Sequence, residues 1–285
     1  MALPLFRRNH NTWVSVLRTS GLSSASAHRF IKSERVGPKQ DVGLITLNSR
    51  RTFNALSTEL MAEVGSELRA YDKDPAIGAV VVASSSPKVF SAGASIHQFL
   101  QNDFLSVYED DFFKDWISFN NMRKPIIAAV NGYAFGGGCE LALTCDIIYA
   151  GKNALFSQPE VLIGTVPGAG GTQRLPRVAG KSLSMEMCLT GDRITADEAL
   201  RRGMISKVFP SEDLTNEAVK LGAKIAGKPP LLVRMIKESV SRSFENFLES
   251  GTKYERFTMH STFALEDRKN AISALPEESN GFKDE

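Results

Sequence analysis

The apolar positions of this 285-residue chain follow two periods, and each period predicts a different kind of element. Three short runs are apolar at almost every position, which is typical of strands buried on both faces, and they cover residues 77–83, 125–130 and 146–150. After Ser57, apolar residues recur at helical spacing, which predicts a helix with Ser57 as its N-cap. A further helix is predicted over 136–144. Strands and helices that alternate in this order predict a parallel sheet wrapped by helices.

The two ends of the chain depart from this alternation. Residues 30–36 and 42–47 have the pattern of two strands joined by a turn at Gly37. Helical patterns dominate the last third of the chain, where helices are predicted over 195–202, 212–226, 230–242, 245–261 and 264–274, with one strand over 205–209. We therefore expect an α/β core over 34–194 and a helical region over 195–285.

The net charge of +2 is unevenly distributed along the chain. Residues 1–33 contain no acid and five basic residues, which are Arg7, Arg8, Arg18, Arg29 and Lys32. Subtracting these five charges from +2 leaves −3 for residues 34–285, and this mildly acidic body lacks the clustered basic residues of a dedicated nucleic-acid binder. No run reaches the roughly 18 apolar residues of a membrane helix. We expect a soluble globular protein with neither a nucleic-acid nor a membrane partner.

Residues 1–33 are also rich in serine and carry scattered apolar side chains. A segment that is basic, rich in serine and free of acids is typical of a mitochondrial transit peptide, because the import machinery reads positive charge and one apolar face. We expect a leader over 1–33, with its boundary within roughly 26–33, and a mature protein in the mitochondrial matrix. The alternative is a tail without a targeting role.

The cysteines and histidines do not predict a metal site. Cys139, Cys145 and Cys188 are an odd, sparse set without metal-ligand spacing, which indicates a reducing compartment and no disulfide framework. Cys139 and Cys145 are expected to pack as small apolar groups in a helix. Two of the four histidines, His10 and His28, fall in the expected leader.

Small residues gather in three stretches, over 90–94, 131–141 and 158–172. Glycines at the start of a helix leave backbone N–H groups accessible to a ligand, although tight packing of helix on sheet explains them equally well. No lysine with serine or threonine comes after them, so this is not a phosphate-binding P-loop. One N–H group from each of the first two stretches could converge on a single oxygen and form an oxyanion hole.

Two glutamates lie in unusually apolar surroundings within these stretches. Glu140 lies among cysteine, leucine and alanine, and Glu160 lies between a proline and Val-Leu-Ile. Either acid alone is best explained by a helix dipole or a salt bridge. Two such acids beside a candidate oxyanion hole favour catalysis instead, because paired carboxyl groups in different environments can divide acid and base roles at one pH.

These stretches together resemble the enoyl-CoA hydratase/isomerase (crotonase) family, from about residue 30 to the C-terminus. The motifs that carry the resemblance are Ala92-Gly93-Ala94, Asn131-Gly132, Gly136-Gly137-Gly138-Cys139-Glu140-Leu141-Ala142, Cys145-Asp146, Pro159-Glu160 and Pro167-Gly168-Ala169-Gly170-Gly171-Thr172-Gln173-Arg174-Leu175. Residues 189–193 and 261–264 are most similar to the mitochondrial short-chain hydratase branch. The resemblance implies a crotonase-like spiral core of ββα repeats, with a C-terminal helical region used for trimer contacts.

The resemblance also implies a reaction, the reversible addition of water to a trans-2-enoyl-CoA, as in fatty-acid β-oxidation and branched-chain amino-acid breakdown. Backbone N–H groups of Ala94 and Gly137 would hold the thioester oxygen, and Glu140 and Glu160 would position the water, with the acid and base roles left open. No cofactor is implied, since CoA is part of the substrate. A homohexamer built as a dimer of trimers is implied.

The substrate-binding residues implied by the family are 94–97 and Gly137. Ser95, Ile96 and His97 replace the usual Asp, hydrophobe and Lys after Ala94, which weakens the case for a charged CoA contact at 97. Alternatives within the family are a methylglutaconyl-CoA hydratase, an enoyl-CoA isomerase and a hydroxyisobutyryl-CoA hydrolase. An RNA-binding or non-catalytic mitochondrial member is an alternative of another class, which the acidic body disfavours.

Overall fold

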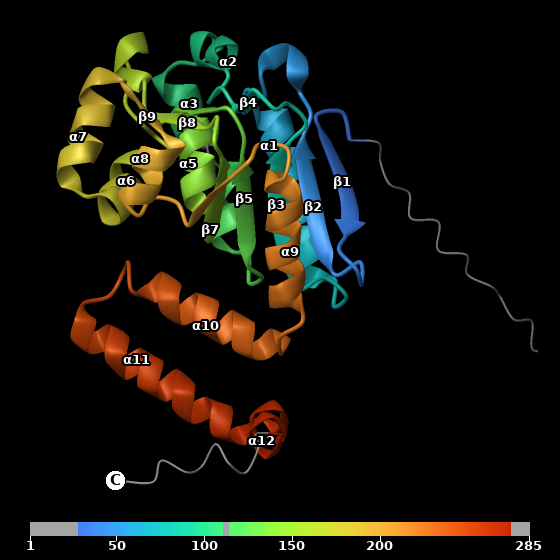
Figure 1. The fold of residues 1–285 in the computed structure, drawn as a ribbon. Coiled ribbons are helices and arrows are strands. Elements are labelled where there is room, and N and C mark those ends of the chain that lie inside the picture. The colour runs from blue at the N-terminus through green and yellow to red at the C-terminus, as the bar shows by residue number, and fades with distance from the viewer. Residues whose placement is uncertain (1–27, 111–113, 275–285) are drawn as a thin grey trace, which may run out of the picture.

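The structure is a computed structural model that describes residues 28–110 and 114–274. A six-stranded sheet, in the order β1-β2-β3-β5-β7-β10, forms its centre (Figure 1). Its strands are β1 (Ile31–Val36), β2 (Val42–Leu47), β3 (Ala79–Ser84), β5 (Ile126–Val130), β7 (Ile147–Gly151) and β10 (Lys207–Phe209). Only the pairing of β1 with β2 is antiparallel, and the other neighbours in this sheet run parallel. The predicted parallel sheet is therefore confirmed, as is the turn between β1 and β2.

The two faces of this sheet are covered by different helices. α1 (Thr58–Lys73) packs on one face and begins as predicted, with the Ser57 hydroxyl accepting a hydrogen bond from the N–H of Leu60. α9 (Leu214–Ala226) covers the other face, as Figure 1 shows. Adjacent residues of β3 divide accordingly, because Val80 joins the cluster of buried residues under α1 and Val81 joins the cluster under α9. Alternation of side chains across a strand with both faces buried explains the continuous apolar runs of the sequence.

A second, four-stranded sheet is not predicted by the hydrophobic pattern. Its order is β4-β6-β8-β9, and its strands are β4 (Val89–Ser91), β6 (Tyr133–Phe135), β8 (Leu155–Ser157) and β9 (Arg193–Thr195). Each strand has three residues, which is too short to show a period of two. β4, β6 and β8 run parallel, and β9 pairs antiparallel with β8. Because the carboxyl ends of parallel strands meet at one edge, the segments after β4, β6 and β8 come together.

Shorter helices lie between the strands of the two sheets. The α-helices of this part are α2 (Ile96–Gln101), α3 (Phe104–Asp110), α4 (Ile117–Asn120), α5 (Gly137–Thr144), α6 (Gly171–Ala179), α7 (Lys181–Thr190) and α8 (Ala196–Arg201). The 3-10 helices are η1 (Arg50–Thr52), η2 (Lys114–Trp116), η3 (Glu160–Ile163) and η4 (Thr262–Ala264), the last of which lies in the C-terminal region. No described helix is both long enough and apolar enough to cross a membrane.

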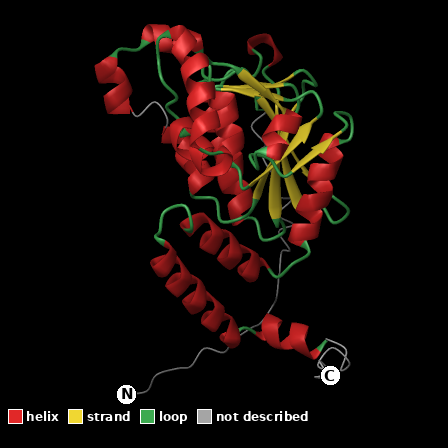
Figure 2. Cartoon of the chain, turned by 60° about the vertical axis from the view of Figure 1, so that its left-hand side comes forward, coloured by secondary structure: helices red, strands yellow, loops and turns green. Residues whose placement is uncertain are grey.

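The last helices extend away from the two sheets, as Figures 1 and 2 show. They are α10 (Pro230–Arg242), α11 (Leu248–Ser261) and α12 (Glu266–Ser273), close to the ranges that the sequence predicts. Lys237 on α10 fastens this region to the core by donating to the carbonyl oxygen of Lys124 at 2.9 Å and to Oδ2 of Asp146 at 2.7 Å. Neither α10 nor α11 contains a fully buried residue, and both expose large apolar side chains.

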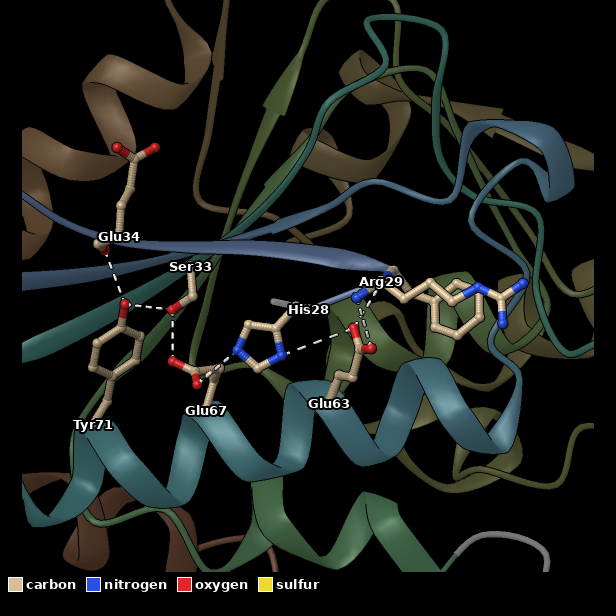
Figure 3. A network of polar contacts seen from close by, with 8 residues as sticks. His28, Arg29, Ser33, Glu34, Glu63, Glu67 and Tyr71 are labelled. Atoms are coloured by element: carbon tan, nitrogen blue, oxygen red, sulfur yellow. Dashed lines mark hydrogen bonds and ion pairs between the residues drawn. The ribbon is translucent and has the colours of Figure 1, made fainter. Parts of the chain in front are cut away.

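A polar network ties the start of the described chain to α1 (Figure 3). Glu63 accepts hydrogen bonds from the backbone N–H groups of residues 29 and 30, each at 2.9 Å. Glu67 lies 2.9 Å from Nε2 of His28 and accepts from the Ser33 hydroxyl at 2.6 Å. Residues 1–27 of the expected leader lie outside the described residues, whereas 28–33 belong to this network and to β1.

Candidate active site

The three stretches rich in small residues come after the three parallel strands of the smaller sheet. Gly93 comes after β4, Gly136 comes after β6, and Gln158 comes directly after β8. The strand pairings bring these segments to one edge, where α5 and η3 begin. Residues that are about 65 positions apart in sequence therefore line one site, in agreement with the rule that α/β proteins place ligands at the carboxyl ends of parallel strands.

The backbone N–H groups of Ala94 and Gly137 lie side by side. A Cβ atom added to Gly137 would lie 3.2 Å from the nitrogen of Ala94, and one added to Gly93 would lie 3.4 Å from the nitrogen of Gly137. Gly137 is the first residue of α5, so its N–H has no partner within the helix. Two neighbouring amides of this kind can stabilise an oxygen that gains negative charge.

Glu140 lies one turn into α5 and is 2% exposed. Its Oε1 accepts hydrogen bonds from the N–H of Ala169 at 2.8 Å and from the N–H of Gly171 at 2.7 Å. Burial raises the pKa of Glu140, while the two backbone hydrogen bonds and the charge of Arg174 act in the opposite direction. The two amide donors favour the charged form of this carboxyl group.

Glu160, the first residue of η3, is 9% exposed. Burial, with a smaller contribution from the charge of Glu140, raises the pKa of Glu160 from 4.5 to about 7, against the opposing effect of a hydrogen bond to its own backbone. The side-chain amide of Gln158 faces this carboxyl group, and turning the amide by 180° places its nitrogen 3.2 Å from both carboxyl oxygens, to which it can then donate. A carboxyl group with such a pKa exchanges its proton near neutral pH, as a general acid or base must.

Gly136 makes room for the carboxyl group of Glu160. Its φ of +52° lies in the region that favours glycine, and a Cβ atom there would lie 2.7 Å from Oε1 of Glu160. Glycine at 136 therefore allows both the positive φ and the close approach of the Glu160 carboxyl group. The two glutamates differ in their environments, since Glu140 accepts two backbone hydrogen bonds, whereas burial is the largest influence on the pKa of Glu160.

The remaining predicted site residues lie at the rim. Ala94 and Ser95 are half-buried, whereas Ile96 and His97 are exposed at the start of α2. Gly137 is buried behind them. This arrangement places the backbone donors inside the site and the side chains of 96 and 97 at its solvent face.

The cysteines behave as apolar packing groups. Cys139 and Cys145 are buried, and burial raises the pKa of both thiols, so that they stay protonated at neutral pH. Their predicted role as small packing residues is confirmed. Within residues 28–110 and 114–274, no group of three or more His, Cys, Asp or Glu side chains is placed to hold a metal ion.

Several residues of the site carry no role in the sequence prediction. The amides of Ala169 and Gly171, the side chain of Gln158 and the guanidinium of Arg174 all lie around the two glutamates. The small-residue stretch over 158–172 and the family motif over 167–175 are the sequence signals for them, and neither reveals that the N–H groups of Ala169 and Gly171 point at Glu140.

Known proteins resemble this chain over most of its length. The family model for enoyl-CoA hydratase/isomerase matches residues 37–285. The mitochondrial enoyl-CoA hydratase of Pongo abelii is 48% identical over 92% of this chain and 91% of its own length. A probable mitochondrial enoyl-CoA hydratase of Dictyostelium discoideum is 44% identical, with 92% and 95% covered. A solved enoyl-CoA hydratase subunit of Geobacillus kaustophilus superposes with a TM-score of 0.84 at 37% identity, covering 87% of this chain and 95% of that one.

Proposed function

The chain belongs to the enoyl-CoA hydratase/isomerase family and acts as an enoyl-CoA hydratase, and we propose that Glu140 and Glu160 carry out the hydration at the edge of the smaller sheet. The observation that carries this proposal is the pair of buried carboxyl groups in unlike environments beside two neighbouring amide donors. The substrate is a trans-2-enoyl-CoA and the product a 3-hydroxyacyl-CoA.

The thioester oxygen of the substrate accepts hydrogen bonds from the N–H groups of Ala94 and Gly137 in this proposal. These hydrogen bonds strengthen as electrons of the carbon–carbon double bond move toward that oxygen, and a single such donor is typically worth about 10²–10³ in rate. The rim residues Ser95, Ile96 and His97 line the path of the acyl-CoA. The exposed imidazole of His97 stands where a lysine is usual in the family, so we assign no charged contact to it.

The environments of the two acids divide their roles. Glu140, whose charged form is favoured by two amide donors, takes a proton from water as the water oxygen bonds to the β-carbon. Glu160, with a pKa of about 7, is protonated in a large fraction of molecules at neutral pH and gives its proton to the α-carbon. One C–O and one C–H bond form as an O–H bond of water and the π bond of the alkene break. The proton that Glu140 takes up then returns to Glu160 through solvent, which restores both acids, and the reverse sequence dehydrates the product.

No cofactor beyond the CoA of the substrate enters this reaction, because acid–base groups and oxyanion donors supply all its steps. We place the activity in fatty-acid β-oxidation and branched-chain amino-acid breakdown. Hydration of crotonyl-CoA, followed as loss of the absorbance of the enoyl thioester, tests the proposal. A purified, folded protein without turnover on any enoyl-CoA would exclude it.

We also propose that the protein is a homohexamer, a dimer of trimers whose subunits meet through the C-terminal region over 195–285. The exposed apolar side chains of this region support the assembly: Leu231, Ile236, Val240, Phe244, Phe247, Leu248 and Phe257. Large apolar side chains that gather on an exposed surface are typical of subunit interfaces. A sedimentation mass corresponding to one chain would contradict it.

Residues 1–33 are proposed to be a transit peptide, cleaved within roughly 26–33, that directs the protein to the mitochondrial matrix. Two relatives are named as mitochondrial, which supports the compartment. The hydrogen bonds of residues 28–30 to α1 favour cleavage before His28, since later cleavage would remove them. A reporter fused to residues 1–33 that stays in the cytosol would contradict this proposal.

A further inference from the structure

Arg174 on α6 lies behind Glu140 and is half-buried, whereas Arg177, one turn further along the same helix, is exposed. The guanidinium of Arg174 reaches two acceptors that lie outside its own helix. Its Nη1 donates to the carbonyl oxygen of Ala169 at 2.9 Å, and its Nη2 donates to Oδ1 of Asn120 at 3.2 Å. Arg177 instead donates to the carbonyl oxygen of Gln173, four residues earlier in α6.

The peptide units around Ala169 connect Arg174 to the acid. The N–H of Ala169 donates to Oε1 of Glu140 at 2.8 Å, while its carbonyl oxygen accepts from Arg174. Gly170, between the two amides that hold Glu140, has a φ of +108°, and a Cβ atom there would lie 1.9 Å from Nη1 of Arg174. The guanidinium thus occupies the space beside the turn 169–171, and a side chain at 170 would displace it.

The charge of Arg174 also acts on Glu140 through space. It lowers the pKa of Glu140 against the effect of burial, and the Glu140 charge in turn opposes the lowering of the Arg174 pKa by burial. The ion pairs of residues 28–110 and 114–274 do not include a direct contact between the two side chains. The other titratable groups that sense Glu140 are Glu160, Cys139 and Cys188, while Cys145 senses Arg174.

We propose that Arg174 is a positioning residue for the hydration reaction. It clamps the turn 169–171 against α4 (through Asn120), so that two amides stay aimed at Glu140 and the carboxyl group stays directed at the reacting water. A planar guanidinium with two donors can bridge two acceptors, which an ammonium group cannot do at the same geometry. This role rests on the catalytic function proposed for Glu140.

The test compares Arg174→Gln, Arg174→Lys and Asn120→Ala with Arg177→Gln as the matched control on the same helix. We expect Arg174→Gln to lower kcat by about tenfold or more with KM for crotonyl-CoA nearly unchanged, because a misaimed base slows chemistry rather than binding. The acidic limb of its kcat/KM profile is expected to move to higher pH, since the pKa of Glu140 rises when the positive charge is lost.

Arg174→Lys and Asn120→Ala separate the effect of the hydrogen-bond geometry around Arg174 from the effect of its charge. Arg174→Lys keeps the charge, so its acidic limb should stay near that of the wild type while kcat lies between those of the wild type and Arg174→Gln. Asn120→Ala removes one anchor and should lower kcat by about two- to fivefold without moving the limb. Arg177→Gln should match the wild type. The proposal is overturned if Arg174→Gln matches Arg177→Gln in both kcat and the acidic limb.

Hydrogen exchange of the peptide that contains residues 168–172 provides a readout without activity. Loss of the clamp should speed exchange of the amides of Ala169 and Gly171 in Arg174→Gln, and to a smaller degree in Asn120→Ala, but not in Arg177→Gln. If exchange in this peptide is unchanged in Arg174→Gln, the clamp does not exist. If the wild type lacks hydratase activity but the variants show the expected exchange pattern, the proposed function is contradicted and the clamp is not.

Discussion

The six-stranded and four-stranded sheets differ in strand length, in burial and in the segments to which their strands lead. β3 and β5 of the larger sheet bury nearly every residue between α1 and α9. The strands of the smaller sheet have three residues each, and β4, β6 and β8 lead into the segments that carry the proposed oxyanion donors, Glu140 and Glu160. The larger sheet contributes more buried apolar residues than the smaller one, and the smaller one brings three distant segments to one edge.

The proposed chemistry therefore lies at the edge of one sheet, while the other sheet contributes mainly to stability. Changes at the edge of the smaller sheet should alter rate far more than stability, and changes in the larger sheet should do the reverse. Substitutions in each sheet can show whether this separation holds and how complete it is.

The largest effect is expected at the two acids. Glu140→Gln and Glu160→Gln should each lower kcat for crotonyl-CoA by about 10²–10⁴, because a positioned acid or base contributes that much. Circular dichroism spectra should remain those of the wild type. Steady-state rates measure the effect, and full activity in both variants would refute the catalytic assignment.

The opposite behaviour is expected in the larger sheet. Ile127 in β5 is fully buried under α9, and Ile127→Ala should lower the free energy of unfolding by about 2–5 kcal/mol through lost burial and a residual cavity. Its kcat at 25 °C should stay within about twofold of the wild type, since the site lies on the other sheet. Urea unfolding and the hydration assay check the two halves of this prediction; a large fall in kcat without unfolding would mean that the sheets are coupled.

A substitution at Gly136 tests whether activity depends on the close approach of the Glu160 carboxyl group to the backbone of residue 136. Gly136→Ala places a Cβ atom against Glu160 and should lower kcat by about 10- to 100-fold as the carboxyl group moves. Gly180→Ala is the matched control, because its φ is +84° but no atom lies within 4 Å of the added Cβ. Equal losses in the two variants would assign the effect to backbone strain rather than to Glu160.

The buried charge of Glu160 is also expected to lower the free energy of unfolding above neutral pH. Its pKa is raised from 4.5 to about 7 in the folded protein, so the folded state loses stability as pH rises from about 4.5 to 7 and does not regain it above. Replacing it by glutamine should therefore raise the free energy of unfolding at pH 8 by about 1–2 kcal/mol and leave it nearly unchanged at pH 4. Urea titrations at both pH values measure this, and a variant that is less stable at pH 8 would show that burial does not penalise the Glu160 charge.

The sequence predicts the larger sheet well because its strands are long enough to show continuous apolar runs. Residues 77–83, 125–130 and 146–150 correspond to β3, β5 and β7 with shifts of one or two residues. The smaller sheet is missed because three residues cannot display a period, and only pairing with distant strands makes them strands. Contacts of this range are set by tertiary structure, which no local pattern records.

The candidate site divides in a similar way. Glu140 and Glu160 are detectable because an acid in an apolar segment is unusual, and Ala94 and Gly137 are detectable through their small neighbours. Arg174 and the amides of Ala169 and Gly171 lie in or beside a glycine-rich segment that the sequence singles out, but that segment does not reveal their partner Glu140, which lies about 30 positions away. Their role becomes visible only in the fold.

The roles proposed for the two acids at the edge of the smaller sheet are tested by the pH dependence of kcat/KM for crotonyl-CoA, measured in the wild type and in Glu160→Gln. Glu160 must be protonated to deliver its proton, so hydration by the wild type should fall as pH rises through about 7, the pKa of that carboxyl group. The residual activity of Glu160→Gln should lack this limb. A wild-type profile without a decline near that pH, or a variant that keeps the same decline, would contradict the assignment of the two acids.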